Sequence, residues 1–311
     1  MTPTVLVPLD GSPLAARALP YAKRLVARRG GRLVLAQVRL PALAFDASGS
    51  DVERVAAAFR AEGVRASSLT YAAPPAAVAD MLRAAVVESR ADLIVMSTHG
   101  RGGLRRTLFG SVADRLIRYA DVPVLLIPPE CHVSWQERGP GLFLVPLDGS
   151  PLAETALSPA VTLARQLNAE LMLVRAVSPA LHTRYRDGKL ILSCADFSEI
   201  EDAWRYLSKQ ANESAAHGCP ASIKVLVGSP ATALTNAART EGADLIAMTT
   251  HGRGGLGRLL LGSVADGVVR RSHVPILLAR SGRVPVPTSE TEETRDVIAT
   301  APLAPACLHG S

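Results

Sequence analysis

The chain has 311 residues, of which 48% are hydrophobic and 20% charged, and it carries a formal net charge of +6. This length predicts two domains with ordinary buried cores, and no apolar run reaches the roughly 20 residues of a membrane-spanning helix. The four cysteines are scattered and the basic residues form no run, so we expect no metal site and no nucleic-acid partner. Because no basic and then apolar leader opens the chain, a cytoplasmic location is favoured.

An α/β pattern runs through the first part of the chain, where short apolar runs alternate with helical periodicity. The strands are expected at 5–9, 33–38, 64–71, 93–96 and 124–127, and the helices after Ser12, near 51–62, near 75–90 and between the last two strands. Ser12 as N-cap and Pro13 as the first helical residue mark the start of the first helix. Pro20, inside that helix, predicts a bend.

The chain repeats itself. Residues 6–15 recur identically at 144–153, and the segment that begins at Ala91 returns almost unchanged from Ala243. The spacing between the two repeated blocks is 14 residues longer in the second copy, and we place these extra residues within 178–220.

The repeat sets the expected domain organisation. We expect a first domain at 1–129, a linker at 130–140, a second domain at 141–281 and a disordered tail at 282–311. Near-continuous apolar strands separated by helices predict two tandem doubly wound, Rossmann-like domains. Each would be a five-stranded parallel sheet of order 3-2-1-4-5 with helices on both faces.

The last strand of each sheet, 122–127 and 274–279, is an apolar edge that invites pairing. We expect the two edges to meet each other, which gives an intrachain pseudo-dimer, or to meet the edges of a second chain in a homo-oligomer.

The expected strand order places its switch point between the first and fourth strands, and a ligand is expected outside their carboxyl ends. Asp10 and Asp148 end the first strand of each copy. Each carboxylate can bind a ribose hydroxyl or a metal beside phosphates, or can simply form a turn with the next amides. We favour the ligand role.

A glycine-rich loop follows the fourth strand of each copy. Gly110 would let the backbone approach a ligand and adopt a positive φ, and Ser111 is expected to cap the next helix with Asp114 completing a capping box. The helix start would then offer free N–H groups and its positive dipole end to a phosphate. Gly262 and Ser263 repeat the arrangement, and two copies of so long a loop favour function over plain caps.

Histidines and arginines within the loop are weaker candidates. No carboxylate or nucleophile recurs beside His99 and His251, so we read them as structural residues or passive phosphate neighbours, and we expect no catalytic residue. Arg101 and Arg253 either contact phosphate or are solvated loop charges.

This pattern resembles the tandem form of the universal stress protein family over about residues 1–128 and 141–280. In ATP-binding members the loop motif is Gly-x-x-Gly-x9-Gly-(Ser/Thr). The resemblance implies that Gly100, Gly252, Gly110, Gly262, Ser111 and Ser263 match this motif, and that Pro8, Asp10, Val38, Pro146, Asp148 and Val177 line the adenosine. The neighbouring residues of the expected cofactor site are Ser97, His99, Arg101, Val112, Thr249, His251, Arg253 and Val264.

Two functions follow from the resemblance. The first is a stress-response regulator that binds ATP, with Mg²⁺ left open, and acts by a conformational or association change with slow hydrolysis or none. The second is an interaction module of the same fold that does not bind nucleotide, because Ser97 and Thr249 replace the first motif glycine. A dinucleotide oxidoreductase ranks last, since the Gly-x-Gly-x-x-Gly pattern at 252–257 follows the fourth strand and not the first.

Overall fold

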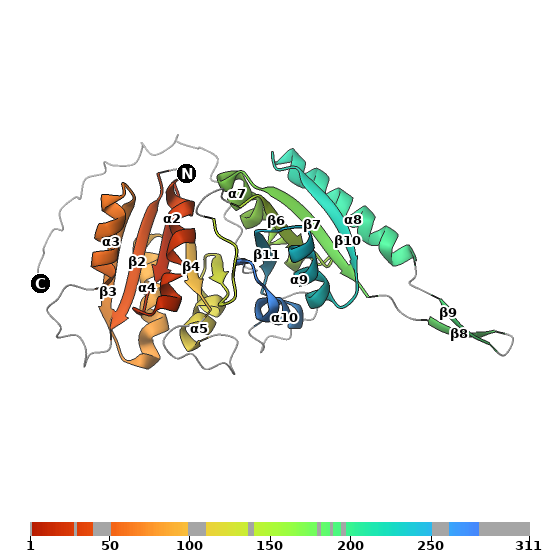
Figure 1. Ribbon diagram of the computed structural model, residues 1–311, viewed down its shortest axis with the longest axis horizontal. Helices are drawn as coiled ribbons and strands as arrows, with labels where there is room; N and C mark the ends of the chain where they lie inside the picture. Colours follow the sequence, from red (N-terminus) through yellow and green to blue (C-terminus); the bar gives the residue numbers. More distant parts are fainter. Residues whose placement is uncertain are drawn as a thin grey trace, which may run out of the picture.

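The computed structural model describes residues 2–27, 30–39, 51–98, 110–135, 140–178, 182–186, 189–193, 197–250 and 261–279 (Figure 1). None of the helices in these ranges combines the length and apolarity that a bilayer crossing requires. The expected tail at 282–311 lies outside the described residues.

The first domain is a parallel sheet covered by helices on both faces, as predicted. Its strands are β1 (Thr4–Pro8), β2 (Arg32–Arg39), β3 (Arg65–Ala72), β4 (Leu93–Ser97) and β5 (Val124–Ile127). Its helices are α1 (Pro13–Ala16), α2 (Leu19–Ala27), α3 (Asp51–Ala61), α4 (Val78–Ser89), which follows the 3₁₀ turn η2 (Pro75–Ala77), and α5 (Ser111–Tyr119). The strand order β3-β2-β1-β4-β5 confirms the expected 3-2-1-4-5.

The second domain repeats this architecture. Its sheet strands are β6 (Leu142–Pro146), β7 (Glu170–Val177), β10 (Ala221–Val227), β11 (Leu245–Thr249) and β12 (Ile276–Ala279), in the order β10-β7-β6-β11-β12. Its helices are α6 (Pro151–Glu154), α7 (Leu157–Leu167), α8 (Phe197–Ala216), α9 (Pro230–Thr240) and α10 (Ser263–Arg271). An antiparallel hairpin of β8 (His182–Arg186) and β9 (Lys189–Ser193) projects from this domain, within the segment where we placed the extra residues (Figure 1).

The first predicted helix is divided into two near Pro20. Ser12 is the N-cap and its Oγ accepts a hydrogen bond from the Ala15 amide at 3.1 Å. The helix then ends at Ala16, and α2 begins at Leu19 with Pro20 as its second residue. Proline has no N–H and its ring would clash with the carbonyl four residues earlier, so it is accommodated in a new first turn. The disturbance that Pro20 predicts is therefore present as an interruption between α1 and α2.

Alternating side chains of each strand enter two separate cores, one on each face of the sheet. Val5 and Val7 of β1 pack with α2 and α3, whereas Leu6 packs with α4 and α5. The same division holds in the second domain, where α7 and α8 cover one face and α9 and α10 cover the other. Elements that follow one another in the chain therefore lie on defined sides of the sheet.

The two sheets join into one ten-stranded sheet. β5 and β12 pair antiparallel, with Leu125 opposite Leu277. This confirms that the two apolar edges meet within the chain, and each core continues from one domain into the other.

The segment after β5 packs against the first domain. Arg17 Nη2 donates to the Cys131 carbonyl at 2.9 Å, and the Tyr21 hydroxyl donates to the Val133 carbonyl. Trp135 is 1% exposed and meets the Tyr21 ring edge-on, with ring centroids 5.1 Å apart. The beginning of the expected linker is thus an ordered part of the core.

Candidate functional site

The carboxyl ends of the two central strands form the candidate site of each domain. The parallel pairing of β1 with β4 ends at Leu6 and Ile94, and continuing its register would bring Asp10 level with Thr98. The pairing of β6 with β11 ends at Leu144 and Ile246, and continuing it would bring Asp148 level with Thr250. Connections on opposite faces of the sheet leave from this point, because α1 follows β1 on one face and α5 follows β4 on the other. Such a switch point is where open α/β sheets bind ligands.

The carboxylates of Asp10 and Asp148 each stabilise a local turn, which is one of the two roles expected for them. Asp10 Oδ1 accepts from the Ser12 amide at 2.9 Å. Asp148 Oδ1 accepts from the Ser150 amide at 2.8 Å and from its hydroxyl at 2.5 Å. The carboxylates are therefore fixed at the ends of β1 and β6. Their contact with a ligand remains a prediction.

The glycines that precede α5 and α10 are extended. Gly110 has φ −63° and ψ 154°, and Gly262 has φ −59° and ψ 155°. The expected positive φ is therefore wrong, and any residue could adopt this backbone conformation. A Cβ built at Gly110 meets no atom of the described residues within 4 Å. None of the described residues therefore blocks a side chain at this position.

These glycines, and not the serines that follow, are the N-caps. The Gly110 carbonyl accepts the first helical hydrogen bond from the Asp114 amide at 3.0 Å, so Ser111 is already the first helical residue. Ser263 has the same place in α10. The predicted capping box is wrong for this reason. Because a glycine cap has no side chain, no side-chain cap bonds the first-turn amides among the described residues.

Hydrogen bonds fix each helix start to the neighbouring strand. The Gly110 amide donates to the Thr98 carbonyl at 3.2 Å, and the Gly262 amide donates to the Thr250 carbonyl at 2.7 Å. Sequence reasoning missed both threonines, although each directly follows a central strand and recurs in both copies. The glycine-rich loop therefore leaves from and returns to one point at the switch.

The middle of each loop lies outside the described residues. This applies to His99, Gly100 and Arg101 and to their counterparts His251, Gly252 and Arg253. Ser97 and Thr249, which replace the first motif glycine, end β4 and β11, and Thr249 is 6% exposed. Val112 and Val264 are partly buried in the first turn of their helices.

Strand register shows that Val38 and Val177, both expected to contact adenosine, are not at equivalent positions. Pro8 and Pro146 end equivalent strands, but the equivalent of Val38 on β7 is Ala176, because both pack in the same core and β1–β2 and β6–β7 share one register. Val177 lies one residue further and packs on the other side of the strand. Val177 is therefore one residue beyond the counterpart of Val38, and the adenosine contacts of both residues stay predictions.

Comparisons with known proteins agree on one family. The model of the universal stress protein family matches residues 1–128 and 142–280. A universal stress protein of Mycobacterium tuberculosis is 32% identical over 199 residues, which cover 62% of this chain and 63% of that relative, so the match spans less than two thirds of the relative's length.

The fold is shared with a solved structure that covers both domains. A universal stress protein of Archaeoglobus fulgidus superposes with a TM-score of 0.67 at 20% identity, covering 91% of this chain and 100% of that one. A universal stress protein solved in complex with cAMP is 25% identical and covers 46% of this chain and 98% of that one, with a TM-score of 0.34.

Proposed function

The chain belongs to the universal stress protein family, and on that premise we propose that it is a cytoplasmic stress-response regulator that binds ATP. One observation carries the proposal: in each domain a helix with a glycine N-cap starts at the switch point, level with a fixed aspartate. Free first-turn N–H groups and the positive end of the helix dipole favour a phosphate.

The described residues suit the three parts of a nucleotide. The phosphates would bind the first turn of α5, where no atom of the described residues lies within 4 Å of a Cβ built at Gly110. The ribose would bind Asp10, whose carboxylate the Ser12 amide already orients. The base would lie over Pro8 and Val38 at the ends of β1 and β2. Mg²⁺ would be held by phosphate oxygens and the Asp10 carboxylate, because hard cations prefer oxygen ligands.

The proposed output is a change in conformation or association, and the topology supports it. α5 leads into β5 and α10 leads into β12, and these two strands form the antiparallel centre of the ten-stranded sheet. A ligand that binds the start of α5 or α10 therefore contacts the helix that leads directly into the strand at the junction between the domains. Asp10 and Asp148 accept hydrogen bonds within their own turns, so they are suited to position a ligand and not to activate a water molecule. We therefore propose that ATP hydrolysis is slow or absent.

The second candidate is an interaction module that binds no nucleotide. The observation that favours it is the pair Ser97 and Thr249, since a side chain stands at the end of β4 and of β11 where ATP-binding members have glycine. The buried Thr249 makes this candidate strongest for the second domain.

Nucleotide analysis separates the two candidates. Purified full-length protein would be denatured and the released small molecules identified by mass spectrometry, and calorimetry on the nucleotide-free protein would count sites for ATP, ADP and AMP. Saturable ATP binding with one or two sites per chain is the expected result. An absence of released nucleotide together with no heat of binding would support the interaction module.

A further inference from the structure

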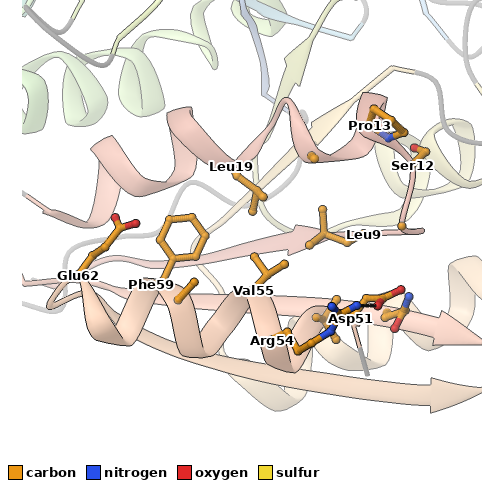
Figure 2. A pocket seen from close by; sticks show the side chains of 14 residues that line it. Leu9, Ser12, Pro13, Leu19, Asp51, Arg54, Val55, Phe59 and Glu62 are labelled. Carbon is orange, nitrogen blue, oxygen red and sulfur yellow. Dashed lines mark hydrogen bonds and ion pairs between the residues drawn. The ribbon is translucent and has the colours of Figure 1, made fainter. Parts of the chain in front are cut away.

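The helix that follows the second strand is longer in the second domain than in the first. α3 has 11 residues and α8 has 20. Shortly after each helix lies a glycine of positive φ, Gly63 with 79° and Gly218 with 72°, so the two helix ends align. Figure 2 shows Asp51 at the start of α3 and Glu62 beyond its end. The residues that α8 has in excess are therefore its first ones, 197–205, and we call them the helix extension.

The hairpin β8–β9, which precedes this extension, is amphipathic. Thr183 lies opposite Leu192, and Tyr185 lies opposite Leu190. Directly paired residues share one face of a ribbon, and successive residues of a strand alternate between its faces. One face therefore holds these mainly apolar positions. The other face holds the three positive charges of the two strands, at Arg184, Arg186 and Lys189.

None of the described elements supports the hairpin. Figure 1 shows it beyond the start of α8 and projecting away from both sheets, with no labelled helix or strand beside it. A two-stranded hairpin is at best marginally stable in water, and packing against a helix is one way to stabilise it. The apolar face of β8–β9 therefore requires a helix that its own chain does not place there.

The helix extension is a surface of this kind. Trp204 is 60% exposed, and tryptophan is enriched in protein interfaces because it buries a large apolar area. Glu201 precedes Trp204 by three residues, so the two are neighbours on the helix surface. The charged residues of the extension are three carboxylates and one guanidinium: Glu199, Glu201, Asp202 and Arg205. Arg205 pairs with Asp202 at 2.8 Å, and the net charge is negative.

The hairpin and the helix extension complement each other in charge and in apolarity, and both belong to one chain. Within a single copy they do not meet, because the hairpin lies beyond the start of α8 and Trp204 stays exposed. A two-fold axis between two copies can bring each hairpin to the extension of the other copy, so that the same contact forms twice. A second copy of this chain is therefore the partner that fits both surfaces at once.

We propose that β8–β9 and the helix extension form the contact between two copies of this chain. The apolar face of each hairpin packs on Trp204 of the other copy and supplies the binding energy by burial. The cations of the hairpin attract the carboxylates of the extension and thereby orient the two chains. The contact does not rest on ATP binding, and none of its residues belongs to the proposed nucleotide site.

Sedimentation velocity of the full-length protein over a range of concentrations tests this contact. The parent should be a dimer. Trp204→Ala should raise the dissociation constant of the dimer about tenfold or more, because a tryptophan at the centre of an interface contributes much of the binding energy. Val87→Ala is the matched control and should leave the dimer unchanged, since Val87 is 74% exposed on α4 of the first domain.

Two charge-reversed variants test whether the hairpin meets the extension of another copy. Arg184→Glu combined with Arg186→Glu makes the hairpin acidic, and Glu201→Lys combined with Asp202→Lys makes the extension basic. Each variant alone should dimerise about tenfold more weakly than the parent, because like charges then meet twice. An equimolar mixture of the two should recover the dimer, because both contacts of the mixed pair again join opposite charges.

Three results would overturn the proposal: a parent that is monomeric at every concentration, a Trp204→Ala variant that dimerises like the parent, or a mixture that associates no more tightly than the separate variants. If a monomeric parent binds vesicles of anionic lipid, the hairpin contacts a membrane and not a second copy. Calorimetry with ATP on the same variants keeps the two proposals separate, since all of them should bind ATP like the parent.

Discussion

Leu125 of β5 lies directly opposite Leu277 of β12, and both are at most 1% exposed at the centre of the ten-stranded sheet. The two domains therefore share their cores across an antiparallel strand pair. A single cooperative unit is the consequence, since neither edge can be exposed without opening both cores.

Replacing Leu125 or Leu277 by alanine should destabilise the whole chain by about 2–5 kcal/mol each, because each leaves a cavity in a shared core. The double variant should deviate from the sum of the single ones, since the residues are in contact. Urea denaturation measures both. Val227→Ala, at a position 59% exposed on the outer strand β10, is the control and should stay within about 0.5 kcal/mol of the parent. Two separate transitions in the parent would contradict the shared core.

The Tyr21 hydroxyl secures the segment after β5, and its loss should be measurable. Tyr21→Phe leaves the Val133 carbonyl without this donor and should cost about 1–3 kcal/mol. It should also slow the reaction of Cys131 with a thiol reagent, because burial raises the pKa of that thiol and the variant removes the Tyr21 hydrogen bond that lowers it. Tyr119→Phe, with Tyr119 47% exposed, is the control and should change neither.

Burial, and then the hydrogen bond with Cys131, raise the pKa of Tyr21 above its usual value of 10. The folded state therefore favours the neutral phenol. Its contribution to stability is complete below pH 10 and is lost as the pH rises beyond it. The parent should lose stability above pH 10 more steeply than Tyr21→Phe, as measured by thermal unfolding at stepwise higher pH. Equal slopes would show that Tyr21 ionises alike in both states.

Asp10→Asn separates the turn role of Asp10 from its proposed role as a ligand contact. The amide oxygen of asparagine can still accept from the Ser12 amide, so the unfolding temperature should not change. ATP affinity should fall about tenfold, since a hydrogen bond to a charged group is lost. Asp92→Asn provides the control, because Asp92 Oδ2 accepts from the Thr4 amide at 2.8 Å at the far end of the same strand. If both variants bind ATP as tightly as the parent, Asp10 stabilises its turn and does not contact the ligand.

Much of this fold could be predicted because its signals are local and occur twice. Apolar runs located all five strands of the first sheet, and their alternation with helices indicated the strand order. The N-cap of α5 was predicted wrongly because the same residue type is common at two neighbouring helix positions. A serine suits both an N-cap and the first helical position, and only the hydrogen bond from Asp114 to Gly110 distinguishes them.

Other features depend on contacts between distant residues. Pro20 predicts a disturbed helix, but the division into α1 and α2 follows from the turn that forms around it. No pattern in the chain indicates that the Tyr206 hydroxyl donates to Glu154 and that the Arg175 guanidinium lies over the Tyr206 ring in the second domain alone, where the first domain has other residues at the equivalent positions. Such differences between copies become visible only when both sheets are aligned by register.

The central claim is that the first turns of α5 and α10 bind the phosphates of ATP. Gly110→Asp combined with Gly262→Asp tests it most directly, because an aspartate N-cap would accept from the same amides and repel a phosphate. Gly110→Asn combined with Gly262→Asn is the uncharged control. Isothermal calorimetry with ATP should show binding by the parent, weaker binding by the asparagine variant and none by the aspartate variant. The aspartate variant should unfold at the same temperature as the parent or higher, since aspartate is at least as good an N-cap as glycine. An aspartate variant that binds ATP as tightly as the parent would contradict the account.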